Sequence, residues 1–234
     1  MSDTVSVLDV DAGLAGVLPP DQVSAARQAT NAAVVRMPAG PWRPAQNADR
    51  ARGGYGMLVV DGLLLRRVGV DGRYGAELLG PGDLLRPWQR DADADEGGTL
   101  QLQWTWRVAS PIRVAVLDQR WAARAANWPQ IGTELAGRAV ARSLRLVVAM
   151  AVAQQPRLDV RLWMLFWDLA NRYGRVRSDG VHVELPLTHE ILSHLAGARR
   201  PSVSAALTRL AADGRVTRQG QRWILAGEPP SLDS

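Results

Sequence analysis

The last third of the chain contains two successive segments in which apolar residues recur at helical spacing. In residues 188–195, Thr188 can cap a helix and Gly197 favours its end. The apolar stripe of this first helix consists of Ile191, Leu192 and Leu195. Pro201 opens the second helix, where its missing N–H has no intrahelical role. The buried face expected for the second helix consists of Val203, Ala206, Leu207 and Leu210.

Two short extended segments follow these helices. Residues 215–218 and 222–225 are joined by a glycine-containing linker, which predicts a hairpin. Helix, turn, helix and hairpin are typical of a winged helix-turn-helix, whose second helix lies in the major groove of DNA. Between Thr188 and Leu225 there are six arginines and two acidic residues, a net charge of +4, whereas the whole chain carries +5. This concentration of positive charge favours contact with phosphates.

Residues 34–117 have the shorter periodicity of β-strands. The expected strands are residues 57–60, 63–70, 74–79, 100–108 and 112–117. Asp61-Gly62 and Asp71-Gly72 are dipeptides that favour hairpin turns, and residues 80–83 (Gly-Pro-Gly-Asp) predict another turn. Several short strands at this spacing indicate a small antiparallel barrel or roll.

From about Trp121 the pattern becomes helical, and residues 131–154 contain no glycine or proline after Gly137. One apolar face carries Ile131, Leu135, Ala139, Leu146 and Met150, and another carries Val140, Leu144, Val147 and Ala151. A helix with two apolar faces needs two partners, for which we expect the roll and the same helix of a second subunit. The alternative is a helix buried within a monomer. The apolar pattern of residues 158–173 predicts a further helix. We expect this helix to pack beneath the two DNA-reading helices as their floor.

The beginning of the chain predicts two short helices over residues 1–33, separated by Pro19-Pro20, with Asp21 as the cap of the second. Residues 1–10 lack the basic start and apolar middle of a signal peptide, and no apolar run reaches transmembrane length. A cytoplasmic protein without membrane contact is therefore expected.

The composition argues against several chemistries. Cysteine is absent, which excludes disulfides and cysteine-held metals, and all 28 basic residues are arginine. The chain has no nucleophile elbow and no P-loop, and His189 and His194, five residues apart, have no nearby carboxylate arrangement that suggests a triad. The alternating aspartates 91, 93 and 95 resemble a calcium loop, but Glu96 and Leu102 occupy its required glycine and glutamate positions. We expect no enzyme activity, no metal site and no cofactor.

The order of these parts resembles the CRP/FNR superfamily of bacterial transcription regulators. The resemblance covers about residues 34–225 and is clearest in residues 187–210 (LTHEILSHLAGARRPSVSAALTRL) with the hairpin that follows. Residues 159–176 (DVRLWMLFWDLANRYGRV) are similar to the family's helix between the dimerisation and DNA-binding parts, and residues 77–85 (ELLGPGDLL) to its turn between two roll strands. Set beside this family, the chain argues against haem sensing, because no histidine lies in the roll.

This resemblance implies DNA contacts for particular residues. Arg200 matches the arginine that reads a base, most naturally guanine, and Ser202 and Ser204 match neighbouring contact positions. Thr188 and His189 match the phosphate-contacting start of the first helix. The remaining candidate DNA contacts are Arg199, Thr208, Arg209 and Arg218. Because Pro201 and Ala205 replace a glutamate and a second arginine of many members, a site other than the family's best-known one is expected.

The sensor part departs further from the family pattern. Cyclic-nucleotide-binding members carry a Gly-Glu-Leu segment and an Arg-Ser or Arg-Thr pair, where this chain has residues 84–88 (LLRPW) followed by the acidic residues 91–96. The carboxylates would repel a cyclic phosphate, so classical cyclic AMP is not expected. Arg86 and Trp88 are candidate effector-binding residues, with packing at a strand end as the alternative. Trp104, Trp106, Trp121 and Trp128 line either an effector cavity or the core.

The sequence thus predicts an α+β chain with three parts. These are an antiparallel, jelly-roll-like β-roll over residues 1–120, a long dimerisation helix over 121–155, and a winged helix-turn-helix over 156–234. The expected function is that of a homodimeric regulator on a pseudo-palindromic site in double-stranded DNA, with RNA polymerase and a small-molecule effector as further partners. The alternative is a ligand-independent DNA-binding or interaction protein with a degenerate, non-sensing roll.

Overall fold

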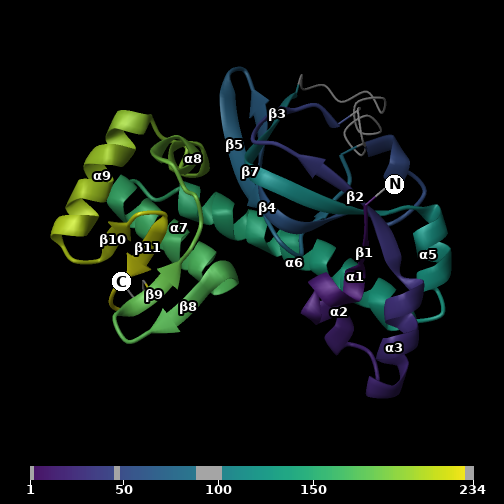
Figure 1. Ribbon diagram of the computed structural model, residues 1–234. Helices are drawn as coiled ribbons and strands as arrows, with labels where there is room; N and C mark the ends of the chain where they lie inside the picture. The colour runs from purple at the N-terminus through teal and green to yellow at the C-terminus, as the bar shows by residue number, and fades with distance from the viewer. Residues whose placement is uncertain (1–2, 45–47, 88–101, 230–234) are drawn as a thin grey trace. The chain divides into compact units, whose positions relative to one another are not determined.

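The computed structural model describes residues 3–44, 48–87 and 102–229 (Figure 1). It confirms an α+β chain with an N-terminal antiparallel sheet, a long helix and a C-terminal helix-turn-helix. The chain divides into two compact units, one of Met1–Gly72 and Leu78–Leu144 and the other of Arg73–Glu77 and Arg145–Ser234. The three-part division at residues 120 and 155 stays a prediction.

Seven strands form the sheet in the first part of the chain. They are β1 (Thr4–Ser6), β2 (Asn31–Met37), β3 (Gly40–Trp42), β4 (Gly56–Val70), β5 (Arg73–Leu79), β6 (Leu84–Leu85) and β7 (Gln103–Leu117). The strand order is β1-β2-β7-β4-β5, with β3 paired to β7 and β6 paired to β4. Every pair whose register is described is antiparallel, as the roll prediction requires.

The Asp61-Gly62 dipeptide does not form the expected hairpin. Strand β4 runs through the dipeptide without a break. Strand β7 is likewise continuous through residues 109–111, which lie between the two predicted strands 100–108 and 112–117. The register of β4 against β7 shifts on both sides of Asp61, which marks a bulge. Gly62 adopts a φ of 82°, and a Cβ there would lie 2.2 Å from the Pro111 carbonyl oxygen. The dipeptide therefore bends a long strand where its partner approaches closely.

The other two predicted turns are confirmed. Asp71 and Gly72 both have positive φ, 47° and 73°, as a two-residue turn between β4 and β5 requires. In the turn from Gly80 to Asp83, the buried Asp83 carboxylate accepts a hydrogen bond from the Gly80 amide at 2.9 Å. This carboxylate fixes the approach to β6.

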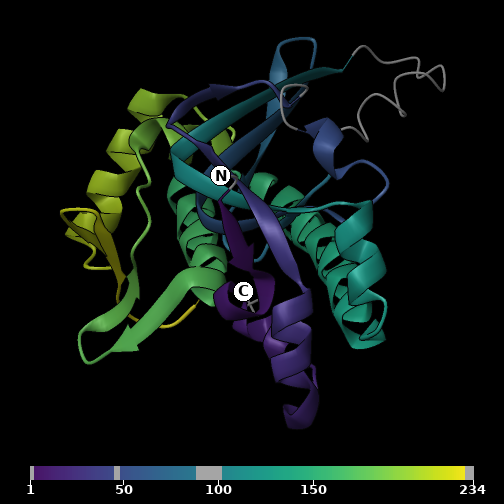
Figure 2. The same ribbon diagram turned by 45° about the vertical axis from the view of Figure 1, so that its right-hand side comes forward.

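The N-terminal segment contains three helices, α1 (Val7–Val10), α2 (Ala12–Gly16) and α3 (Pro20–Ala29), which lie beside β1 and β2 (Figure 2). Asp21 is not the cap of α3, because the helix begins at Pro20 and Pro19 occupies the cap position. The fixed φ of proline suits the first helical position, so the helix starts earlier than predicted. Asp21 still complements the helix dipole from the first turn.

Two apolar clusters form the core of this part. One lies inside the roll and includes Trp42, Met57, Leu64 and Trp106. The second joins α1, α2 and α3 to α5 (Gln119–Ala125), β4, β7 and the start of the long helix. Trp121 is fully buried in the second cluster and donates its indole N–H to the Thr30 carbonyl at 3.0 Å. Of the two interpretations of Trp121, the structure supports the core.

The long helix α6 spans Pro129–Ala153, close to the predicted range. Ile131 and Leu135 are fully buried, but Ala139 and Met150, expected on the same face, are exposed and Leu146 is half-buried. The prediction that this whole face is covered was wrong, because the fully buried apolar residues of α6 are confined to its first two turns. The second apolar face is uncovered in the single chain. Its exposed residues are Val140 (71%), Leu144 (66%), Val147 (60%) and Ala151.

Arg138 anchors the packed end of α6. Its guanidinium contacts both carboxylate oxygens of Asp11, the Glu134 carboxylate at 2.9 Å and the Gly82 carbonyl at 3.2 Å. Asp11 also caps α2 by accepting from the Leu14 amide. Burial raises the pKa of the Asp11 carboxyl, but the hydrogen bonds from Arg138 and Leu14 outweigh it and hold that pKa below its usual value. The same pair raises the pKa of Arg138.

Replacing Asp11 by asparagine is expected to lower the free energy of unfolding at neutral pH by roughly 3 kcal/mol, because Arg138 loses a largely buried partner. A lowered native pKa stabilises the fold above the unfolded value of about 3.9. The stabilisation is lost as the pH falls through the lower native pKa, so the difference between the two proteins should shrink in acid. Urea denaturation across pH measures this. Asp9→Asn, in an exposed pair with Arg27, is the control and should change little.

The C-terminal part builds a second, smaller body around α7 (Leu158–Tyr173), whose bounds match the prediction. Its other elements are β8 (Gly174–Arg177), β9 (Gly180–Val183), α8 (His189–Leu195), α9 (Arg200–Ala212), β10 (Val216–Gln219) and β11 (Arg222–Leu225). The buried residues of α7 are Leu162, Trp163, Phe166, Leu169 and Ala170, and the helix packs against α9 and β9 (Figure 1). The predicted floor beneath the reading helices is confirmed.

Strands β8 and β9 were not predicted from the sequence. They form a hairpin that extends the β10-β11 pair into a four-stranded antiparallel sheet of order β10-β11-β9-β8. The signal was present in the chain, since Arg-Val-Arg and Gly-Val-His-Val flank the turn residues Ser178 and Asp179. Within the described ranges, every helix is too short or too polar to cross a membrane.

Candidate nucleic-acid interface

The predicted helix-turn-helix is built from local caps. The Thr188 hydroxyl oxygen accepts from the Ile191 amide at 3.1 Å, so Thr188 is the cap of α8, as predicted. The helix ends before Gly197, whose φ of 59° lets the Ala198 amide return to the Ser193 carbonyl at 2.9 Å. The expected turn and its glycine are therefore confirmed.

Arg161 of α7 fixes this turn, and no sequence signal singled it out. Its guanidinium donates to the Ala196 carbonyl at 2.8 Å and to the Gln155 carbonyl at 2.6 and 3.1 Å. One side chain thus satisfies a terminal carbonyl of α8 and a carbonyl in the segment after α6. No sequence pattern marks this role, because the bonded residues are 6 and 35 positions away.

Helix α9 presents one buried and one exposed face. The four residues predicted to be buried, Val203, Ala206, Leu207 and Leu210, are all buried. The exposed residues, with the cap residue Arg199 before the helix, are Arg199, Arg200, Pro201, Ser202, Ala205, Thr208, Arg209, Ala211 and Ala212. Because the buried face locks the helix, these side chains form a fixed outer surface that starts with two arginines.

His189 and Ser204 form one unit. The His189 Nδ1 lies 2.8 Å from the Ser204 hydroxyl oxygen, and that hydroxyl also bonds the Arg200 carbonyl at 3.2 Å. A hydroxyl has one proton, so when Ser204 donates it to the carbonyl, the Nδ1–H of His189 is the donor. The contact ties the start of α8 to the first turns of α9, and it could not be predicted from residues 15 positions apart.

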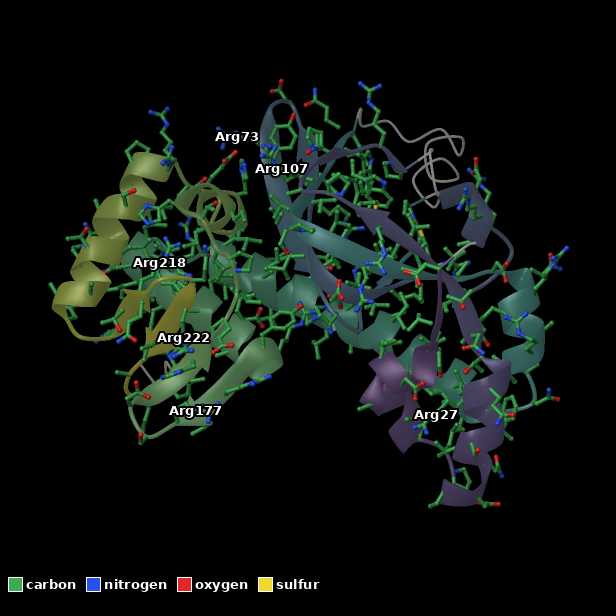
Figure 3. The ribbon with its side chains drawn as sticks, viewed as in Figure 1. Arg27, Arg73, Arg107, Arg177, Arg218 and Arg222 are labelled. Carbon is green, nitrogen blue, oxygen red and sulfur yellow. The ribbon has the colours of Figure 1, made fainter. Side chains whose placement is uncertain are left out.

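The hairpin of β10 and β11 is confirmed, with Gln219 paired to Arg222 across a two-residue turn. The exposed Arg218 lies over the Trp223 ring, 5.0 Å from its centroid, and donates to the Gly220 carbonyl. Arg222 instead pairs with Glu184 at 3.0 Å, outside the segment whose charge was counted. Both arginines are labelled in Figure 3, where they belong to this hairpin. The local positive charge is therefore smaller at Arg222 than the sequence suggested.

Of the two candidate effector residues, Arg86 follows β6 within the described chain. Trp88 and the acidic residues 91–96 lie outside the described residues. All three histidines lie in the C-terminal unit, and His182 contacts the Asp179 carboxylate at 2.7 Å. In the part of the chain that the structure describes, no group of three or more metal-binding side chains comes together.

A helix-turn-helix with a β-hairpin wing, preceded by a long helix and an antiparallel roll, is the order of elements found in CRP/FNR-type transcription regulators. Residues 160–232 match the family model of the Crp-like helix-turn-helix domain. The chain accordingly has a Crp-like DNA-binding domain and the fold of CRP/FNR-type transcription regulators, which confirms the predicted resemblance. No curated protein matches the chain.

Solved structures of such regulators share the fold at low sequence identity. FixK2 from Bradyrhizobium japonicum is 16% identical with a TM-score of 0.59, over 84% of this chain and 93% of that one. A CooA mutant from Carboxydothermus hydrogenoformans is 13% identical with a TM-score of 0.58, over 96% and 93%. A CRP-family transcriptional regulator from Thermus thermophilus, TTHB099, is 20% identical with a TM-score of 0.54, over 82% and 92%.

Proposed function

We propose that the chain is a homodimeric transcription factor that reads a pseudo-palindromic DNA site with α9. The observation that carries this proposal is the outer surface of α9, which is exposed, begins with Arg199 and Arg200, and is held rigid by a buried opposite face. A helix of this kind fits the major groove, where an arginine can donate two hydrogen bonds to guanine.

The contacts fall into two classes. Arg200 supplies direct base readout, with Ser202 beside it on the exposed first turn of α9. Phosphates are held by the polar and basic residues around it, which are Thr188, His189, Arg199, Ser204, Thr208, Arg209 and Arg218. Ser204 acts together with His189, since their side chains are hydrogen-bonded. Pro201 and Ala205 remove two contacts that many family members make, so the site read differs from the family's best-known one.

The uncovered face of α6 provides the dimer interface. Val140, Leu144, Val147 and Ala151 are spaced four, three and four residues apart, which is the a/d pattern of a coiled coil. Three of these are large and 60–71% exposed in the single chain, whereas such side chains are normally covered. Pairing two α6 helices places two α9 helices on one DNA duplex, with half-sites about 34 Å apart.

Regulation follows from the same arrangement. An effector in the roll, other than classical cyclic AMP, shifts the long helices and biases the spacing of the two reading helices. The further partner that we propose is RNA polymerase, and the proposed location is the cytoplasm. No enzymatic activity is part of the proposal.

Selection of bound sequences from a random duplex library, with purified protein and no added ligand, tests the proposal. We expect enrichment of a palindrome whose half-sites are about one helical turn apart, because a dimer presents two related helices. Salt-sensitive binding without enrichment would show that the reading helices need an effector to come into register. Absence of any DNA binding at low salt would contradict the proposal, because six arginines in and near the helix-turn-helix should attract DNA of any sequence.

A further inference from the structure

A row of aromatic and basic side chains crosses three strands inside the roll. Trp42 of β3 is paired in register with Trp106 of β7, and Trp106 is paired with Arg66 of β4. The two indole rings meet edge to face with centroids 5.5 Å apart. The Arg66 guanidinium carbon lies 5.8 Å from the Trp106 ring centroid and 5.7 Å from that of Trp104. The four side chains thus form one cluster, which we call the Trp–Arg row.

The indole N–H groups of Trp42 and Trp106 have no acceptor in the part of the chain that the structure describes. The two residues are each 7% exposed, and among the described residues neither Nε1 atom has a hydrogen-bond partner. A buried donor that lacks an acceptor destabilises a fold by about 1–3 kcal/mol, so such groups are normally paired. Here two such donors belong to residues that are paired across β3 and β7. They lie beside the Arg66 guanidinium, which is placed over the rings of Trp104 and Trp106.

We propose that the Trp–Arg row binds the carboxylate of a small, flat organic acid, which is the effector of the roll. An ionised carboxylate has about four acceptor positions, enough for both indole N–H groups and the Arg66 guanidinium. The apolar residues that share the cluster inside the roll, Leu64 and Val108 among them, suit a ring and not a polar body. This inference rests on the proposed function, because it gives the chemical class of the effector invoked there.

The row differs from Trp121, whose indole N–H already has the Thr30 carbonyl as acceptor. Only donors that lack an acceptor gain hydrogen bonds when an anion binds. This difference separates Trp42 and Trp106 from a tryptophan that serves the core alone.

The test uses the full-length protein without DNA and three probes, benzoate, indole-3-carboxylate and 1-naphthoate. Benzamide serves as the neutral counterpart, and acetate as the anion without a ring. Binding is measured by calorimetry and by the ¹H–¹⁵N resonances of the nine indole groups, assigned with Trp→Phe variants. We expect at least one aromatic carboxylate to shift the Trp42 and Trp106 resonances to lower field while that of Trp121 stays, and benzamide and acetate to bind more weakly.

Arg66→Met should weaken that binding by about 10- to 100-fold, since a charge-assisted pair is lost. The matched control is Arg107→Met, which removes the same charge from an exposed position next to Trp106 on β7 (Figure 3). No shift with any of the three carboxylates, or equal loss in both variants, would overturn the proposal and identify the row as packing. Since no DNA is present, such a result leaves the outcome of the duplex selection unaffected, and the two proposals can fail separately.

Discussion

Replacing Leu144 by aspartate is expected to turn the proposed dimer into a monomer and to weaken binding to the proposed palindromic site by about 10²- to 10⁴-fold. Leu144 lies at the middle of the uncovered face of α6 and is 66% exposed in the single chain. Two such helices would place a carboxylate from each chain in the apolar seam, where neither has a partner. A monomer binds one half-site and loses the gain from engaging both. Sedimentation velocity at micromolar concentration and titration of labelled duplex measure the two effects.

Ala149→Asp is the control for this substitution. Ala149 is exposed on α6 and lies about 140° around the helix from Leu144, so the variant adds the same charge outside the seam. It should remain dimeric and bind DNA as the parent does. A Leu144→Asp protein that sediments as a dimer and keeps its affinity would rule out this face as the interface.

Replacing Arg200 by alanine should cost about 1–3 kcal/mol at the selected site, or roughly 5- to 150-fold in affinity, and should remove the preference for one base pair in each half-site. The reason is that Arg200 stands exposed on the first turn of α9, where a guanidinium can reach a base edge. Competition with duplexes carrying each of the four base pairs at that position measures the preference.

Arg209 provides the contrast. It is also exposed on α9, further along the helix, and is proposed to contact a phosphate. Arg209→Ala should weaken binding to all sequences alike and reduce the slope of log K against log salt by about one. If Arg200→Ala discriminates base pairs as well as the parent does, the base-reading role belongs to another residue.

The helix-turn-helix could be predicted closely because its signals are local. Thr188, Gly197 and Pro201 each act on the backbone within a few residues, so they define the ends of α8 and α9 without reference to the rest of the fold. The same locality made the prediction for Asp61-Gly62 wrong. That dipeptide favours a hairpin by itself, and only the approach of Pro111 on β7 makes it a bulge.

Pairings between distant residues could not be predicted. The contact between His189 and Ser204 and the bonds of Arg161 depend on how α7, α8 and α9 pack. The apolar pattern of α6 likewise showed two faces but not how far each is covered, so Ala139 and Met150 were expected to be buried and are exposed. Sequence periodicity gives the direction of a side chain on a helix, whereas burial depends on the partner that meets it.

The bonds of Arg161 decide where the chain can bend. The Arg161 guanidinium donates both to the Gln155 carbonyl and to the Ala196 carbonyl at the end of α8. The segment between α6 and α7 is therefore fixed to the helix-turn-helix by hydrogen bonds. A swing of the DNA-binding part that keeps these bonds intact therefore takes place on the N-terminal side of Gln155, in α6. In the proposed dimer, α6 would then have two roles, to form the interface with its partner and to absorb the bend, so a change that favours one acts on the residues of the other.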